Sequence, residues 1–219
     1  ALIRSLERQP LLVVLRPEEP ARVAPLLARF LQIGCLHIEL AWNEHPAWPR
    51  QCLELIQAFP QLQLGAASIA DRRGLEAAVE AGFRYAVSPI FNAGMLEMAR
   101  SHGLALVPGV MTPTEVRRAI SWGCGIVKLF PAAGLGPRYW SGLRGPLSPS
   151  REHPWPFCIA AGGLGPADVS AWLAAGVDAV ALGSALLRPE AQTPSETIAG
   201  VPMQLDRLAK LLQDITAAE

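Results

Sequence analysis

The stretch QLGAASIADRRGLEAAVEAGFRYAVS, residues 63–88, contains one complete strand–helix–strand unit. Residues 63–67 form a short apolar run, residues 72–81 have apolar positions at helical spacing, and residues 85–88 form a second apolar run. Gly82 stands between the helical stretch and the second run, where a helix before a strand typically stops. The stretch therefore predicts two strands of a parallel sheet joined by a helix.

The same alternation continues along the whole chain of 219 residues. It predicts eight strands, at residues 11–16, 35–40, 63–67, 85–88, 105–108, 126–130, 157–161 and 179–182. Helical stretches lie between them, for example at 19–32 and 72–81, and a last one covers 204–216. Further glycine stops precede strands at Gly34, Gly103 and Gly176. The Pro-rich stretch 145–156 is predicted to be one long loop.

Eight such units in a chain of this length fit a compact (β/α)8 barrel, the TIM barrel. A doubly wound open sheet would more often carry a Gly-rich turn after its first strand, and residues 15–19, LRPEE, contain no glycine. No linker or low-complexity segment divides the chain. We therefore expect an α/β protein with one barrel domain over residues 1–219.

The composition excludes several classes of partner. The formal net charge is +0, with no block of like charges, so neither nucleic acid nor an anionic membrane is an expected partner.

The four cysteines lack CxxC spacing, which argues against a zinc site and against a disulfide framework. The first ten residues carry charges where a signal peptide needs an apolar run, so we expect a cytoplasmic protein with reduced thiols.

Lys128 lies in the apolar run GIVKLFPA, residues 125–132, and the chain has only one other lysine, Lys210. Burial in a strand disfavours the ammonium form, which lowers the pKa of a lysine and makes its amine a better nucleophile. This is the preparation that Schiff-base chemistry requires. The structural alternative is a side chain that extends to solvent at the strand end or pairs with a carboxylate.

Glu39 is the natural partner for this lysine. In CLHIEL, residues 35–40, His37 and Glu39 alternate with apolar residues and would point into the barrel, as would Lys128 and Phe130 in the later strand. Glu39 and Lys128 either form a structural ion pair or act together, with the amine forming an imine and the carboxylate moving protons. We expect His37 to be a core residue deeper in the barrel.

Glycines follow the last two predicted strands, at Gly162 and Gly163 in AAGGL and at Gly183 before Ser184 in LGSALL. In barrels, these two loops often bind phosphate through backbone N–H groups. Glycine also serves ordinary tight turns. The presence of glycines after both strands favours phosphate binding, and with it a small phosphorylated substrate.

These residues together resemble the class I 2-keto-3-deoxy-6-phosphogluconate (KDPG) and 4-hydroxy-2-oxoglutarate (KHG) aldolases. The similarity runs through nearly the whole chain, and its most specific segments are VKLFPA and PGVMTPTE, the latter at residues 108–115. The resemblance implies a homotrimeric barrel that cleaves a 2-keto-3-deoxy-6-phospho sugar acid to pyruvate and an aldehyde such as glyceraldehyde 3-phosphate, without a metal. It leaves open whether 4-hydroxy-2-oxoglutarate is also a substrate.

Carried over by position, the resemblance implies that Lys128 is the Schiff-base lysine and Glu39 the general acid/base. It implies a substrate-binding set and a phosphate-binding set; the first is Arg16, Asn43, Ser68, Pro89 and Phe130, and the second is Gly162, Gly163, Gly183 and Ser184.

Two positions depart from the gluconate-type pattern. Asn43 stands where those enzymes have an arginine, and Ala161 lacks their hydroxyl. The similar 2-keto-3-deoxy-6-phosphogalactonate aldolases carry an asparagine at the first position and also share the stretch at residues 134–139. Because the guanidinium that would clamp the pyruvate carboxylate is missing at position 43 and the hydroxyl is missing at position 161, a non-catalytic paralogue that binds a phosphorylated metabolite is one alternative. The other keeps the barrel and the phosphate site but is an imine-free sugar-phosphate isomerase, with Lys128 and Glu39 as acid and base.

Overall fold

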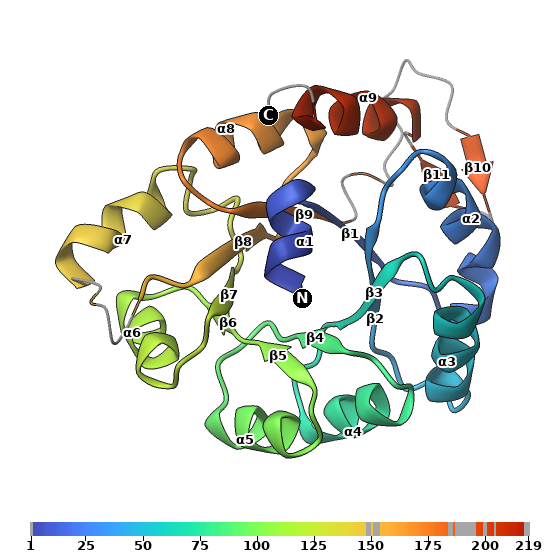
Figure 1. The fold of residues 1–219 in the computed structure, drawn as a ribbon, viewed down its shortest axis with the longest axis horizontal. Coiled ribbons are helices and arrows are strands. Elements are labelled where there is room, and N and C mark those ends of the chain that lie inside the picture. The colour runs from blue at the N-terminus through green and yellow to red at the C-terminus, as the bar shows by residue number, and fades with distance from the viewer. Residues whose placement is uncertain are drawn as a thin grey trace.

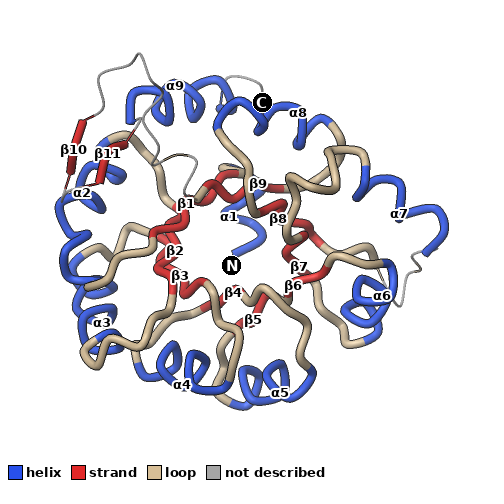
Figure 2. The backbone as a smooth tube through the Cα atoms, turned by 180° about the vertical axis from the view of Figure 1, so that it is seen from behind, coloured by secondary structure: helices blue, strands red, loops and turns tan. Residues whose placement is uncertain are grey.

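The chain forms a closed ring of parallel strands with helices around it, as both views of the backbone show (Figures 1 and 2). The computed structural model describes residues 2–147, 150, 154–183, 186, 196–198, 201–203 and 205–216. Strand order in the sheet is β5-β4-β3-β2-β1-β9-β8-β7-β6, and β5 continues directly into β6, which closes the barrel. Within these described ranges, no helix is long and apolar enough to cross a membrane.

The elements have the following bounds. The barrel strands are β1 (Leu11–Leu15), β2 (His37–Ala41), β3 (Gln63–Ala67), β4 (Tyr85–Val87), β5 (Ala105–Val107), β6 (Gly109–Val110), β7 (Ile126–Leu129), β8 (Phe157–Ala161) and β9 (Ala179–Leu182). Outside the barrel, β10 (Glu196–Ile198) pairs antiparallel with β11 (Val201–Met203). The α-helices are α1 (Leu2–Arg8), α2 (Ala24–Gln32), α3 (Trp48–Ala58), α4 (Arg72–Glu80), α5 (Ala93–Ser101), α6 (Pro113–Ser121), α7 (Tyr139–Leu147), α8 (Val169–Ala174) and α9 (Leu205–Thr216), and the 3-10 turns are Pro20–Val23 and Pro166–Asp168.

The predicted barrel is confirmed, with small differences at the ends of elements. Proline has no N–H to donate to the sheet, and Pro108 divides the fifth predicted strand into β5 and β6. The helix predicted over 19–32 begins as a 3-10 turn at Pro20. The predicted loop 145–156 is partly wrong because α7 extends to Leu147. The first residue of the last predicted helix, Gln204, lies outside the described residues.

Alternation along the strands separates two apolar cores. One set of side chains packs outward against the helices; examples are Ile38, Leu40 and Leu129. The other fills the barrel interior, with members such as Leu12 and Ile159. Residues two apart on a strand face the same side, so each strand supplies both cores. Both cores consist of buried residues, so any polar group placed inside the barrel is removed from water.

Helix α1 closes the N-terminal end of the barrel, and it was not predicted from the sequence. In Figures 1 and 2 it lies across the centre of the ring of strands. Leu6 is completely buried against the interior core, and Ser5 Oγ lies 2.8 Å from Nε2 of His37. Seven residues are too few to show a helical period, so only its contacts with the barrel make this segment recognisable.

Candidate active site

Lys128 is in the middle of β7 and points into the barrel. It is 7% exposed, and its Nζ lies 4.5 Å from the centre of the Phe130 ring. Burial is the main cause that lowers its pKa; the charge of Arg16 lowers it further, and the carboxylate of Glu39 acts in the opposite direction. A larger fraction of the amine is therefore neutral than in a free lysine, as a nucleophile at a carbonyl carbon requires.

Glu39 enters the same space from β2, as the alternation predicted. It is 2% exposed, and burial raises its pKa to about 7, although the charges of Lys128 and Arg16 oppose the shift. A carboxyl group with this pKa both accepts and donates a proton near neutral pH. Such a group is suited to general acid/base catalysis.

The two groups affect each other electrostatically but do not form a direct ion pair. The ion pairs among the described residues, all of them on the surface, do not include one between Lys128 and Glu39. One oxygen of Glu39, Oε1, is buried without any hydrogen-bond partner in the described part of the chain. A structural ion pair would have satisfied that oxygen. The arrangement instead keeps both groups available to a third molecule.

Arg16 and Ser68 meet at the C-terminal edge of the barrel. Nη1 of Arg16 donates a hydrogen bond of 2.7 Å to Oγ of Ser68, which immediately follows β3 and has a positive φ of 61°. Positive φ is uncommon for residues other than glycine and concentrates at functional sites. The contact places a guanidinium and a hydroxyl side by side near the lysine, the combination that binds a carboxylate.

Asn43 lies at the same end of the barrel but uses its amide within the protein. Its Nδ2 donates hydrogen bonds of 2.7 and 3.1 Å to the carbonyl oxygens of Pro17 and Glu18, and its Oδ1 accepts one from the N–H of His45. Pro17 follows Arg16 directly. Asn43 therefore holds the loop that carries Arg16, which is a role that its type alone did not reveal.

Pro89 and Phe130 complete the predicted substrate-binding set. Pro89 follows β4 and is half-buried; its carbonyl group packs so closely on Gly109 that a Cβ there would be 2.3 Å from the oxygen. Phe130 follows β7, is half-buried, and places its ring beside the amine of Lys128. The ring gives the lysine an apolar wall on one side.

The glycines after β8 have packing reasons of their own. A Cβ on Gly162 would lie 2.8 Å from the Phe130 ring, and one on Gly163 would lie 2.8 Å from Ala133. The N–H of Gly165 donates to Asp168, so this helix start is already capped by a carboxylate. Gly183 follows β9 in an open position, and Ser184 lies outside the described residues. Phosphate binding at Gly162, Gly163 and Gly183 remains a prediction.

One interior polar residue was not singled out from the sequence. Tyr85 begins β4 and is 4% exposed, and the charge of Glu39 contributes to its raised pKa, after burial itself. The alternation of β4 would have placed it inside the barrel, but the run at residues 85–88 reads as an ordinary apolar strand in which tyrosine is common. Its proximity to Glu39 needs the strand register and is visible only in the structure.

Comparison with known proteins identifies the family. The family model "KDPG and KHG aldolase" matches residues 2–203. The chain belongs to the KDPG and KHG aldolase family. This is a family of class I aldolases, which are lyases of sugar-acid metabolism, and a phosphorylated keto-acid is the substrate type that it implies.

Individual relatives of this aldolase agree in length as well as in fold. A probable 2-dehydro-3-deoxy-6-phosphogalactonate aldolase of Rhizobium meliloti (strain 1021) is 27% identical over 83% of both chains. The 2-dehydro-3-deoxy-6-phosphogalactonate aldolase of Escherichia coli (strain K12) is also 27% identical, over 82% of this chain and 85% of its own. The structure of a Legionella pneumophila KDPG aldolase with pyruvate captured as a covalent carbinolamine is 21% identical, covers 100% of this chain and 97% of its own, and gives a TM-score of 0.74, which shows the shared fold.

Proposed function

We propose that this aldolase cleaves a 2-keto-3-deoxy-6-phospho sugar acid to pyruvate and an aldehyde such as glyceraldehyde 3-phosphate. The observation that carries the proposal is Lys128, a buried lysine with a lowered pKa that has no ion-pair partner among the described residues. It lies within electrostatic range of Glu39, whose pKa of about 7 suits proton transfer.

The reaction begins with attack of the neutral Lys128 amine on the C2 ketone of the substrate. The resulting carbinolamine loses water, with Glu39 supplying the proton that the leaving hydroxyl needs, and a protonated imine forms. The carboxylate of Glu39 then takes the proton of the C4 hydroxyl. The C3–C4 bond breaks, its electron pair moves toward the imine to give an enamine, and the aldehyde leaves. Protonation at C3 and hydrolysis release pyruvate and restore the amine.

The remaining site residues bind the two ends of the substrate. Arg16 and Ser68 hold the pyruvate carboxylate, supported by their mutual hydrogen bond, and Asn43 contributes by holding the loop of Arg16. Pro89 and Phe130 form the apolar walls. At the other end, the backbone N–H groups of the loops after β8 and β9 bind the phosphate, through Gly162, Gly163, Gly183 and Ser184.

The galactonate form of the substrate has the better support. Arg16 supplies a guanidinium to the carboxylate site although position 43 is an asparagine, and the two relatives described above are both named for 2-dehydro-3-deoxy-6-phosphogalactonate. By resemblance to the family, the active assembly is a homotrimer. Light scattering of the purified protein tests the trimer, and assay of both sugar-acid epimers tests the substrate.

Trapping of an imine tests the reaction type. The protein is incubated with pyruvate and borohydride and its intact mass is measured, because reduction makes a lysine–pyruvate imine permanent. We expect one adduct on the wild type and on Lys210→Ala, and none on Lys128→Ala. Lys210 is exposed and is the only other lysine in the chain, which makes it a matched control. Absence of an adduct on the wild type at millimolar pyruvate would overturn the proposal.

A further inference from the structure

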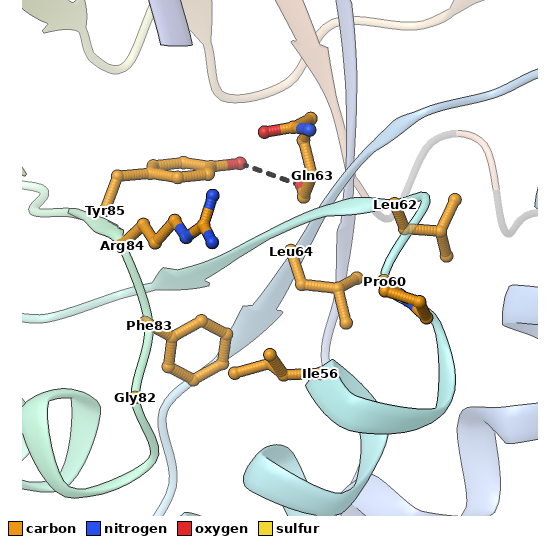
Figure 3. Close-up of a pocket in the computed structure, with 9 residues that line it drawn as sticks. All are labelled: Ile56, Pro60, Leu62, Gln63, Leu64, Gly82, Phe83, Arg84 and Tyr85. Atoms are coloured by element: carbon orange, nitrogen blue, oxygen red, sulfur yellow. Dashed lines mark hydrogen bonds between the residues drawn. The ribbon is translucent and has the colours of Figure 1, made fainter. Parts of the chain in front are cut away.

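The ring of Tyr85 lies across the backbone of the neighbouring strand at Gly65. A Cβ on Gly65 would be 2.2 Å from Cζ and 2.6 Å from the hydroxyl oxygen of Tyr85, so only glycine leaves room for the ring. Figure 3 shows the ring directed from β4 toward Gln63, with the hydroxyl at the main chain of that residue. The side chain thus spans β3 and carries its hydroxyl toward β2.

The strand register places that hydroxyl beside Glu39. Gly65 pairs with Glu39 and Gln63 pairs with His37, and both β2 side chains point into the barrel. The hydroxyl lies over the segment from Gln63 to Gly65. Along the barrel axis it is therefore level with the part of β2 between His37 and Glu39. The influence of the Glu39 charge on Tyr85 agrees with this position.

Hydrogen bonding leaves three side-chain groups without an effective partner at this point among the described residues: the Tyr85 hydroxyl, Oε1 of Glu39 and Nδ1 of His37. In the part of the chain that the structure describes, the Tyr85 hydroxyl has one hydrogen bond, to the carbonyl oxygen of Gln63 at 3.5 Å, and this is longer than an effective O–H···O bond. Oε1 of Glu39 is buried and has no partner there. Buried polar groups in folded proteins are nearly always paired, and a hydroxyl donor matches a carboxylate acceptor.

We propose that Tyr85 is a positioning residue for Glu39: its hydroxyl donates a hydrogen bond to the Glu39 carboxylate, directly or through one buried water molecule. The bond orients the carboxylate toward the substrate and favours its charged form. This inference rests on the proposed role of Glu39 as the proton-transferring group.

The other charged or titratable groups that face Glu39 do not replace this contact. Among the described residues these are Lys128 from β7 and Arg16 after β1, with His37 one inward position below on β2. Lys128 and Arg16 act on Glu39 through their charge. His37 contacts Ser5 through Nε2, and its buried Nδ1 is the other group that the Tyr85 hydroxyl could bind; a bond to His37 instead would leave the pKa of Glu39 unchanged in Tyr85→Phe. Tyr85 also lines a cavity of about 170 Å³ at the N-terminal end of β3 and β4, bounded by Ile56, Leu64 and Phe83 among others (Figure 3). The Tyr85 side chain therefore extends from this cavity toward Glu39.

The test is Tyr85→Phe, which removes the hydroxyl and keeps the ring. The pKa of Glu39 is read from the pH-dependent infrared absorption of its carboxyl group, assigned by comparison with Glu39→Gln. Loss of a hydrogen bond to the charged form raises a carboxyl pKa, so we expect an upward shift of about one pH unit. The acidic limb of kcat/KM should move by the same amount. Tyr139→Phe is the control, because the other tyrosine of the chain donates its hydroxyl bond to Met111 outside the barrel.

A second variant reverses the sign and does not depend on how Tyr85→Phe folds. In Tyr139→Phe, Tyr85 is the only tyrosine, and its replacement by 3-fluorotyrosine makes the hydroxyl a stronger donor. We expect the pKa of Glu39 to fall. An unchanged Glu39 pKa in the fluorinated protein, or in folded Tyr85→Phe, overturns the inference. The infrared titration needs no turnover, and pyruvate trapping on Lys128 is measured on the same samples, so failure of this inference is distinguished from failure of the proposed reaction.

Discussion

The two ends of the barrel interior are built from the same strands but differ in the size of their side chains. Toward the C-terminal end, four strands have alanine at an inward position, namely Ala41, Ala67, Ala161 and Ala181, and two others have Val87 and Val107. Toward the N-terminal end most inward positions are large, Ala179 being the exception, and α1 adds a further side chain; the large residues are Leu12, Tyr85, Phe157 and Leu6. Large side chains therefore pack inside the N-terminal end, whereas alanines line the C-terminal end, where barrels carry their active sites and where we expect the substrate to bind.

Titratable groups are buried at both ends, so burial alone does not distinguish a reactive group. Burial lowers the pKa of His37 to about 4, although its backbone contact with Leu11 opposes the shift. His37 is nevertheless held by Ser5 of α1 and packed on all sides. Glu39, two residues further along the same strand, is one inward position closer to the alanines of the C-terminal end, of which Ala41 is the next on β2. We infer that the position of a perturbed group along the barrel, and not its burial, decides whether a substrate can reach it.

The largest expected effect on kcat separates two single substitutions at the polar residues of β2, Glu39 and His37. Glu39→Gln should lower kcat by about 10²–10⁴-fold, the usual contribution of a general acid/base. Pyruvate should still be trapped on Lys128, but more slowly, because Glu39 also supplies a proton during imine formation. His37→Asn removes the contact with Ser5 and should cost about 1–3 kcal/mol of the free energy of unfolding, with kcat per folded molecule changed only a few-fold. Steady-state kinetics and urea unfolding of both variants make the measurement.

This comparison fails in either of two ways. A Glu39→Gln variant with the kcat of the wild type would remove Glu39 from the chemistry. A His37→Asn variant that folds normally but loses as much kcat as Glu39→Gln would mean that the N-terminal end takes part in the reaction.

A smaller effect on the reaction is expected from changing the size of one inward side chain at each end of the barrel. Ala161→Leu places three more carbon atoms beside the site and should reduce the rate of pyruvate trapping by about 100-fold, since about 3 kcal/mol of overpacking would fall on the bound substrate. Leu12→Ala makes a cavity in the N-terminal end and should cost about 2–5 kcal/mol of stability without slowing trapping per folded molecule. Normal trapping in Ala161→Leu would show that the alanine layer is not the substrate space.

The sequence predicted the barrel and the inward positions of Glu39 and Lys128 better than it predicted the surroundings of these two residues. Alternation in CLHIEL and in the run around Lys128 was enough to place Glu39 and Lys128 inside, because strand period is a local property. The partnership of Tyr85 with Gly65 and the closure by α1 involve segments that are distant along the chain. Such contacts depend on strand register and packing, which no local pattern encodes.

Asn43 shows the same limit within the site. Its place in the substrate-binding set came from the resemblance and stays a prediction. The structure adds a contact that the resemblance did not indicate, because the amide donates to the carbonyl groups of Pro17 and Glu18. A side-chain amide can donate and accept at once, so the residue type allows either role. Only the position of the loop after β1 shows that the amide donates within the protein.

The smallest expected effect is on stability and concerns the backbone at Ser68, at the C-terminal end of the barrel. Ser68 is the only non-glycine residue with a positive φ in the described part of the chain, and its hydroxyl accepts the bond from Arg16. Ser68→Ala loses the bond and keeps the strained φ, so it should lower the free energy of unfolding by about 1 kcal/mol. Ser68→Gly loses the same bond but relieves the strain, and should be about 1 kcal/mol more stable than Ser68→Ala.

Both Ser68 variants should raise the KM of the substrate several-fold, because both leave Arg16 without its partner. Urea unfolding measures the difference between them, and kinetics measures what they share. Equal stability of the alanine and glycine variants would mean that Ser68 carries no backbone strain. If Ser68→Gly is more stable than Ser68→Ala and both have a raised KM, the strained backbone at Ser68 lowers the stability of the protein but holds Arg16 where a substrate carboxylate can reach it.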